Sequence, residues 1–224
     1  MYAMLWTRPD IAYAVGLVSQ FNHSPVWEHW MVVKWIFGYL VGTRHFGLRY
    51  GTTDASAGYS NADWGSGHNR NSVGGSVFLL NGGAVSWSSK KQTSVALSST
   101  EAEYMSITQA AKEVVWLRVL LEELRAIEHI RRISQLHSDN QGALALARNP
   151  DYHARTYDID IQYHFIRELG MAEKVYLVFC LSSDMITDIM TKALPCTTHE
   201  ILTIAMGMVD GAGKQYGTLR EGAC

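Results

Sequence analysis

The sequence is poor in cysteine and has no large excess of charge of either sign. Cys180, Cys196 and Cys224 are far apart, odd in number and without a Cys-x-x-Cys pair. This spacing argues against a disulfide scaffold and a cysteine zinc site, and it favours a reducing compartment. Nineteen Lys and Arg residues against 21 Asp and Glu give a formal charge of −2. That balance excludes a uniformly basic coat for nucleic acid but leaves room for a local basic groove.

Long apolar segments are also absent. The best candidate, 31–41, is short and contains Lys34, whereas a membrane span needs about 20 apolar residues. The first residues lack the regions of a signal peptide, and we expect the chain to begin within a longer coding region. Because 47% of the residues are apolar, a core is available. The sequence predicts a globular protein inside the cell, in the cytoplasm or alternatively in the nucleus.

Glycine and apolar periodicity divide the chain into helical and strand-like segments. Residues 1–48 predict short helices whose aromatic side chains need a partner: Trp27, Trp30, Trp35 and Phe37. Strands are expected at 58–64, 76–80, 84–89, 133–137 and 175–180. Longer helices are expected at 99–125, 140–148, 159–173 and 184–192. Three strands in a meander, then alternating helices and strands, predict an α/β fold with a mixed five-stranded sheet and flanking helices.

Four acids stand at strand ends or on helix faces rather than in charged runs: Asp63, Glu103, Asp139 and Asp188. Acids in such positions converge in many sheets that carry helices on their faces. A converging cluster of carboxylates binds Mg²⁺ and leaves coordination positions for water and phosphate oxygens. The pattern is therefore compatible with two-metal hydrolysis of a phosphodiester.

Each acid also has an ordinary structural explanation. Asp139 suits the N-cap of a helix, and Glu103 suits the positive end of a helix dipole. Asp188 fits a solvated helix face, and Asp63 fits a turn at a strand end. Glu103 nevertheless shares the apolar stripe of its helix with Ile107, and a buried acid requires a partner or a metal.

Longer motifs connect these acids in a fixed order. They are SWSSKKQ at 86–92, ALSSTEAEY at 96–104, DNQ at 139–141, YHFIRE at 163–168 and DIMTKALP at 188–195. Together they resemble the ribonuclease H region of copia-type LTR retrotransposon polyproteins. TRPDIAY at 7–13 and EHW at 28–30 resemble the end of the reverse transcriptase region that precedes it there.

The resemblance covers about residues 1–210 and implies three segments. Residues 1–50 would be a helical remnant of the reverse transcriptase C-terminal region, 51–195 a ribonuclease H-like domain and 196–224 a C-terminal tail. The first strand of the domain would be central and would lie beside the fourth. The partners implied are an RNA–DNA hybrid, whose RNA strand is cleaved, and the remainder of a retrotransposon reverse transcriptase, with no membrane.

The family site is an Asp-Glu-Asp-Asp set that binds two Mg²⁺ or Mn²⁺ ions. Glu103, Asp139 and Asp188 match three of these acids. The motif that carries the other acid, Tyr-Ser-Asp-Ala-Asp-Trp, reads here as Tyr59-Ser60-Asn61-Ala62-Asp63-Trp64, so that Asn61 stands at the first acid position. The chain contains no Tyr-x-Asp-Asp polymerase signature, and no polymerase activity is expected.

Asn61 predicts an impaired enzyme, because its amide oxygen is neutral and half of the group is a donor. Asp63 lies on the same strand face about 6.6 Å further along and is a candidate substitute as catalytic residue and metal ligand. The function expected is a weakened ribonuclease H-type endonuclease. The alternatives are an inactive module that binds nucleic acid or protein, and a relic without function.

Further candidates lie outside the acids. Ribonucleases H often use a mobile histidine near the last acid to help product leave, and His164 is a candidate for that role, although its apolar neighbours favour a packing role. Lys90, Lys91 and Arg118 are candidates for phosphate contacts. Basic residues of this kind more often form a solvated face.

Overall fold

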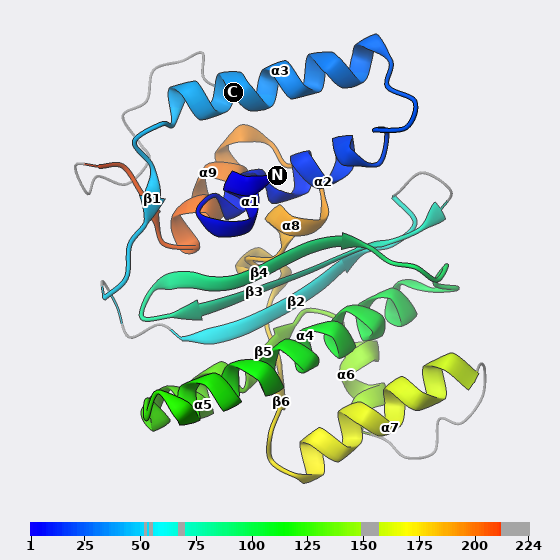
Figure 1. Ribbon diagram of the computed structural model, residues 1–224. Coiled ribbons are helices and arrows are strands. Elements are labelled where there is room, and N and C mark those ends of the chain that lie inside the picture. The colour runs from blue at the N-terminus through cyan, green and yellow to red at the C-terminus, as the bar shows by residue number, and fades with distance from the viewer. Residues whose placement is uncertain (52, 54–55, 67–69, 149–156, 212–224) are drawn as a thin grey trace.

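The computed structural model describes residues 1–51, 53, 56–66, 70–148 and 157–211 (Figure 1). A five-stranded sheet in the order β4-β3-β2-β5-β6 lies at its centre. The strands are β2 (Ala57–Asp63), β3 (Val73–Leu80), β4 (Gly83–Lys91), β5 (Gln135–Ser138) and β6 (Tyr176–Phe179). β2, β3 and β4 are antiparallel neighbours, whereas β5 runs parallel to β2 and β6 parallel to β5. The expected mixed sheet is confirmed, with the first of its strands central and beside the fourth.

The hairpin between β3 and β4 turns where the sequence indicates. Asn81 and Gly82 both have positive φ, at 50° and 81°. Asparagine and glycine tolerate this left-handed conformation better than other residues do. The turn therefore sets the register in which Leu80 and Gly83 lie opposite each other.

One long helix, α4 (Ser99–Glu123), crosses one face of the sheet (Figure 1). The Ser98 side chain caps it by accepting a hydrogen bond from the Glu101 backbone N–H at 3.1 Å. The apolar stripe of the helix is buried in the core: Ile107, Ala110, Val114, Leu117 and Leu121. Burial of each larger aliphatic side chain in this stripe stabilises the fold by about 1.5–3 kcal/mol.

Shorter helices complete this side of the sheet. α6 (Gln141–Arg148) and α7 (Tyr157–Met171) pack against α4. α5 (Ile127–Ile133), which follows α4 closely, is a helix that the sequence patterns did not predict. It forms because Ile130 and Ile133 are buried in the same core as α4.

The other face is covered by segments from both ends of the sequence, α2 (Ala12–Ser19), α8 (Asp188–Thr191) and α9 (Cys196–Ala205). A second core between them and the sheet contains Val77, Leu79, Met190 and Met206. The helix expected at 184–192 is only the single turn of α8, preceded by the 3₁₀ turn η3 (Ser182–Asp184). The backbone at Met185 is extended and its side chain is buried, so core contacts override helical geometry here.

The first and last described segments are joined to each other. β1 (Gly47–Leu48) pairs in antiparallel fashion with β7 (Met208–Val209). In η1 (Pro9–Ile11), the Asp10 carboxylate accepts hydrogen bonds from buried Arg8 at 2.6 Å and from the Tyr39 hydroxyl at 2.7 Å. The Asp10 carbonyl oxygen lies 3.0 Å from Nε2 of His199 in α9. Residues 196–209, expected as part of a tail, thus form a helix and a strand that pack on the N-terminal helices.

Among the described cysteines, Cys180 is free and half-buried.

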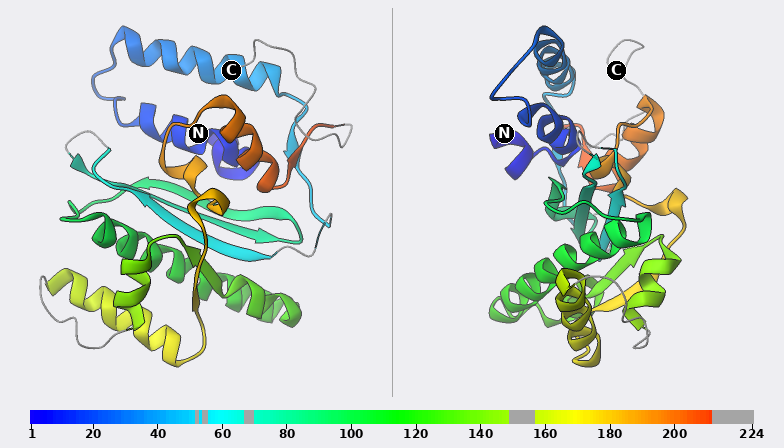
Figure 2. Two further views of the ribbon diagram at one scale, coloured as in Figure 1. Left: turned by 180° about the vertical axis from the view of Figure 1, so that it is seen from behind. Right: turned by 90° about the vertical axis from the view of Figure 1, so that its right-hand side faces the viewer.

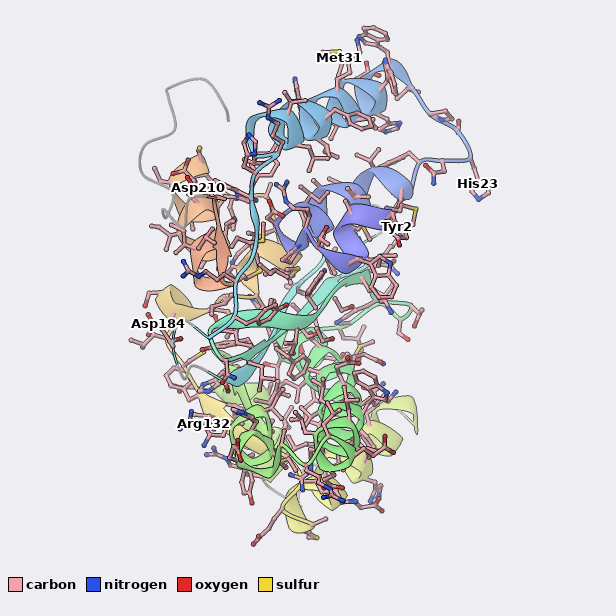
Figure 3. The ribbon with its side chains drawn as sticks, turned by 60° about the vertical axis from the view of Figure 1, so that its left-hand side comes forward. Tyr2, His23, Met31, Arg132, Asp184 and Asp210 are labelled. Carbon is pink, nitrogen blue, oxygen red and sulfur yellow. The ribbon has the colours of Figure 1, made fainter. Side chains whose placement is uncertain are left out.

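The N-terminal helices leave aromatic surface exposed. α3 (Trp27–Gly42) has no buried residue, and α1 (Tyr2–Trp6) has none either. Trp27, Trp35 and Phe37 are 65%, 66% and 59% exposed. We expected these side chains either to pack on the sheet domain or to remain exposed, and they are exposed. Figure 3 shows Met31 on α3 at the opposite end of the molecule from Arg132.

No helix in the described ranges is long and apolar enough to cross a membrane. Figure 2 shows the layers of the molecule from two further sides, with α4 on one face of the sheet and α8 and α9 on the other.

Candidate catalytic site

The structure brings together the residues that the sequence aligned with the family acids. Asn61 lies near the end of β2, Glu103 in the early turns of α4, Asp139 directly after β5, and Asp188 at the start of α8. Because β2 and β5 are parallel neighbours, the positions that follow them meet at one edge of the sheet. α4 and α8 bring Glu103 and Asp188 to this edge from opposite faces.

Asp188 is held by two donors. Nδ2 of Asn61 donates to its Oδ1, and Nζ of Lys192 lies 3.0 Å from its Oδ2. Burial raises the pKa of Asp188, against the lowering effects of Lys192 and Asn61, and the charge of Asp139 raises it further. The amide of Asn61 therefore acts here as a donor to a carboxylate.

Close packing of α8 on the sheet depends on a glycine. Gly75 lies opposite Asn61 in the β2–β3 register. A Cβ at Gly75 would lie 2.7 Å from Cβ of Met190 and 2.8 Å from Cγ2 of Thr191. The absence of a side chain on β3 lets α8 approach close enough for Asp188 to reach Asn61.

Glu103 is 4% exposed, and its two oxygens differ. Oε1 accepts a hydrogen bond from the backbone N–H of Ala62 at 2.9 Å. Oε2 is buried and has no hydrogen-bond partner in the described part of the chain. Burial raises the pKa of Glu103 to about 8; the Ala62 N–H opposes this, and the charges of Asp139 and Asp188 add to it. The charge of Lys192 also lowers this pKa, which nevertheless favours the protonated carboxyl at neutral pH when no divalent cation is bound.

Neighbouring residues perform the ordinary roles considered for two of the acids. The helix after β5 is capped by Asn140, whose Oδ1 accepts from the Ala143 N–H at 2.9 Å. Asp139 instead accepts a hydrogen bond from the Ser182 hydroxyl at 2.7 Å. At the start of α4, Glu101 accepts from the Leu97 N–H, whereas Glu103 points to β2. Asp139 and Glu103 are thus left available for another role.

Anionic oxygens from Glu103, Asp139 and Asp188 are the donors that Mg²⁺ and Mn²⁺ prefer. The unpartnered Oε2 of Glu103 fits such an ion in its chemistry. Among the residues that the structure describes, no three His, Cys, Asp or Glu side chains are close enough to hold a metal as they stand. Asn61 adds no anionic oxygen, so this donor set fits one divalent cation better than two.

The structure does not bring Asp63 into this group. Its charge, after burial, raises the pKa of Tyr13 in α2. No contact between described residues joins it to Glu103, Asp139 or Asp188. Asp63 lies on the expected strand face but beside a different element.

The remaining candidates lie elsewhere. His164 is exposed on α7, which does not fit the packing role that its neighbours favoured. Nη1 of Arg118 donates to Oγ of Ser134 at 2.8 Å, so this residue ties α4 to the segment before β5. Lys90 and Lys91 are the last residues of β4.

Sequence reasoning missed three side chains at the site. Lys192 follows Asp188 by four residues, a spacing that predicts a helical ion pair. Ser182 reaches Asp139 from a turn that no local pattern indicates. Burial, followed by the charges of Asp139, Asp184 and other acids, raises the pKa of the Cys180 thiol to about 11, so this thiol is protonated at neutral pH.

No protein-family model matches the chain. It is 43% identical over 212 residues, 93% of its length, to the retrovirus-related Pol polyprotein from transposon TNT 1-94 of Nicotiana tabacum. It is 39% identical over 208 residues, 92% of its length, to the corresponding polyprotein from transposon RE1 of Arabidopsis thaliana. The chain spans only 16% and 14% of these relatives. A stretch of 122 residues is 51% identical to secreted RxLR effector protein 161 of Plasmopara viticola, of which it covers 86%, and makes up 53% of this chain.

Two solved structures are similar in shape. LC11-RNase H1, isolated from compost, is 13% identical with a TM-score of 0.46, and the match covers 62% of this chain and 94% of that one. The N-terminal RNase H domain of Rv2228c from Mycobacterium tuberculosis is 11% identical with a TM-score of 0.41, covering 67% and 98%. Because these relatives match nearly its whole length at 43% and 39% identity, the chain is a homologue of one segment of the retrovirus-related Pol polyproteins of plant transposons.

Proposed function

We propose that this chain is a weakened ribonuclease H-type endonuclease that cleaves the RNA strand of RNA–DNA hybrids. The observation that supports this most is the buried Glu103 carboxyl. One of its oxygens lacks a hydrogen-bond partner among the described residues, and Asp139 and Asp188 both raise its pKa. Three acids that repel one another at a strand edge are costly unless a cation binds there.

Glu103, Asp139 and Asp188 would hold the divalent cation, Mg²⁺ or Mn²⁺. When bound, the cation supplies a Lewis acid for the scissile phosphate. The chain's own residues keep the ligands in place: the Ala62 N–H orients Glu103, and Ser182 orients Asp139. Asn61 and Lys192 restrain Asp188.

Asn61 limits the rate in this proposal. The resemblance implies a site for two ions in which an acid, not an amide, would stand at the position of Asn61. The Asn61 amide is neutral, and its NH₂ group is directed to Asp188. Each loss of about 1.4 kcal/mol in stabilisation of the transition state slows the reaction tenfold.

The test is a gel assay with a labelled RNA–DNA hybrid in Mg²⁺ and in Mn²⁺. We expect the Asn61→Asp variant to cleave at least about a hundredfold faster than the native chain, or about 2.7 kcal/mol on the barrier. This difference in cleavage rate should be smaller in Mn²⁺, which tolerates less ideal coordination than Mg²⁺ does. Adding Asp139→Asn to the Asn61→Asp variant should abolish cleavage. Equal cleavage by the native chain and Asn61→Asp would contradict the role given to Asn61.

A binding module without catalysis is the second candidate. It is favoured by the contacts of Asp188, since Asn61 and Lys192 already occupy its two oxygens. In that case neither the native chain nor Asn61→Asp cleaves the hybrid, although both bind it.

We also propose that the remainder of a Pol polyprotein covers the exposed aromatic side chains of α3. These include Trp27, Trp35 and Phe37, and the relatives carry the matching segment within a much longer chain. Mixing this chain with the reverse transcriptase region of the TNT 1-94 polyprotein should give a complex in gel filtration. Trp35→Glu should weaken that complex, and an unchanged complex would argue for another contact surface.

A further inference from the structure

Trp64 directly follows β2, three residues after Asn61, and it is both exposed and fixed. Its side chain is 51% exposed, yet its Nε1 donates a hydrogen bond to the carbonyl oxygen of Ala96 at 3.0 Å. An exposed indole usually gains little from being held still. A fixed and exposed aromatic ring close to a candidate catalytic site is instead arranged to contact a ligand.

The side of the sheet on which Trp64 lies follows from the strand register and from its hydrogen bond. Ala62, Gly74 and Lys90 lie side by side across β2, β3 and β4. A Cβ at Gly74 would lie 3.3 Å from Oγ of Ser106 in α4, so this row faces α4. Trp64 comes directly after β2, and its hydrogen bond to Ala96 holds the indole against the segment that leads into α4. The indole, Lys90 and the Glu103 helix therefore share one side of the sheet.

Hydrogen bonds hold the segment between β4 and α4 on both sides of Ala96, whose carbonyl oxygen accepts the hydrogen bond from Trp64. Nδ2 of Asn71 donates to the Gln92 carbonyl oxygen at 2.7 Å, and Nε2 of Gln92 donates to the Ala102 carbonyl oxygen at 2.8 Å. Between these anchors, Val95 and Leu97 are 52% and 73% exposed. Apolar side chains thus stand out from a fixed backbone at the end of the sheet where β4 ends and α4 begins (Figure 1).

We propose that Trp64, Lys90, Val95 and Leu97, here called the Trp64 surface, bind the sugar–phosphate backbone of a nucleic-acid duplex beside the site of cleavage. The proposal rests on the function proposed above and assigns the substrate contact next to Glu103. Lys90 is exposed and has no ion pair within the described ranges, so its charge is available to a phosphate. Trp64, Val95 and Leu97 offer apolar area to sugar faces.

The size of the surface favours a nucleic acid over a protein partner. Stable protein interfaces use about 20–30 residues on each side, whereas this patch has three apolar side chains next to a cation and an acidic site. A cation beside apolar groups complements a backbone of alternating phosphates and sugars.

The experiment measures binding of a fluorescein-labelled RNA–DNA hybrid to the full chain by anisotropy, in EDTA so that nothing is cleaved. Trp64→Ala should weaken binding about tenfold or more. Trp64→Phe should bind within about threefold of the native chain, because it keeps a ring but loses the bond to Ala96. Lys90→Ala should lower the slope of log affinity against log salt by about one.

The matched control is Trp116→Ala. Trp116 is 57% exposed and lies on α4 about 20 Å beyond Glu103, so its removal should leave binding unchanged. Equal binding by the native chain and Trp64→Ala, with unchanged thermal unfolding, would overturn the proposal. So would a loss as large in Trp64→Phe as in Trp64→Ala, since that result assigns Trp64 a structural role through Ala96.

Binding in EDTA separates this inference from the proposed function. If hybrid binding depends on Trp64 but the Asn61→Asp variant does not cleave, the Trp64 surface is supported and the proposed nuclease function is overturned. If the Asn61→Asp variant cleaves the hybrid equally well with and without Trp64→Ala, the proposed nuclease function is supported and the Trp64 surface is overturned.

Discussion

At the scale of single residues, the pair of Asn61 and Asp188 decides how the candidate site behaves without metal. The amide donates to the carboxylate, and it removes one negative charge from a group of acids whose members raise one another's pKa. One oxygen of Asp188 is thus satisfied by the Asn61 amide without a cation.

The first prediction is that Asn61→Asp destabilises the fold without metal. Two carboxylates would face each other in place of a donor and an acceptor, which costs about 1–3 kcal/mol. Saturating Mg²⁺ should recover most of this loss, because ligand binding to the native state stabilises it. Urea unfolding of both proteins, in EDTA and in Mg²⁺, measures the effect. A variant whose stability does not respond to Mg²⁺ more than that of the native chain would contradict a cation site.

The second prediction concerns the pH dependence caused by Glu103. Its pKa is about 8 in the fold against an ordinary 4.5, so between these values the native state keeps a proton that the unfolded chain releases. The free energy of unfolding should therefore fall as pH rises through this range, by at most about 1.4 kcal/mol for each pH unit.

Glu103→Gln removes the titration, and its stability should be nearly level over the same pH range. Chemical denaturation between about pH 5 and about pH 9 compares the two, with Glu122→Gln on the exposed side of α4 as a control. If the free energy of unfolding of the native chain changes as little with pH as that of Glu103→Gln, the Glu103 carboxyl is ionised in the fold.

At the scale of elements, the position of α8 on β3 controls the site. The sequence led us to expect a helix of two turns around Asp188, yet only one turn forms. Its place depends on Gly75, where no side chain separates the strand from Met190 and Thr191.

The third prediction is that Gly75→Ala displaces α8 and costs about 1–3 kcal/mol of stability, as overpacking does. In the Asn61→Asp background it should also reduce hybrid cleavage, since Asp188 moves with α8. Gly38→Ala is the matched control, because a Cβ there meets nothing within 4 Å. In the exposed helix α3 it should stabilise by about 0.5–1 kcal/mol. A Gly75→Ala protein as stable as the native chain would show that α8 shifts without strain.

At the scale of the whole molecule, the two ends of the described chain act as one unit on the sheet. β1 pairs with β7, and His199 contacts Asp10 between α9 and η1. The Asp10 carboxylate also accepts hydrogen bonds from buried Arg8 and from the hydroxyl of Tyr39 in α3. The N-terminal helices are therefore held in part by residues that the sequence analysis assigned to a tail.

The fourth prediction is that a chain ending after Pro195 loses protection in α2 and α3. Without α9 and β7, the second core loses Leu202 and Met206 and the pairing of β1 is lost, while α4 keeps its own core. Hydrogen exchange should become faster throughout α2 and α3 and stay unchanged in α4. A chain ending after Asp210 keeps both elements and serves as the control. Unchanged exchange in α3 of the shorter chain would show that α2 and α3 hold together without the C-terminal segment.

The strands, the long helix and the match of Asn61, Glu103, Asp139 and Asp188 to the family acids could be predicted from the residues alone. Alternation along a strand and the stripe of a helix are local patterns, and acids at strand ends can be read along the chain. Topology then brings them to one edge of the sheet. The same reasoning failed for α5, α8 and α9, which are short and take their form from the cores that they cover.

The partner of each polar side chain, in contrast, depends on how the elements pack. Asn140 caps α6 in place of Asp139, Asp63 lies by Tyr13, and the Asn61 amide is directed to Asp188. These outcomes depend on contacts between residues as far apart as 61 and 188, and on an approach of α8 that a single glycine permits. Hydrogen-bond partners are set by distance in space to within a few tenths of an ångström, and local sequence carries no such information.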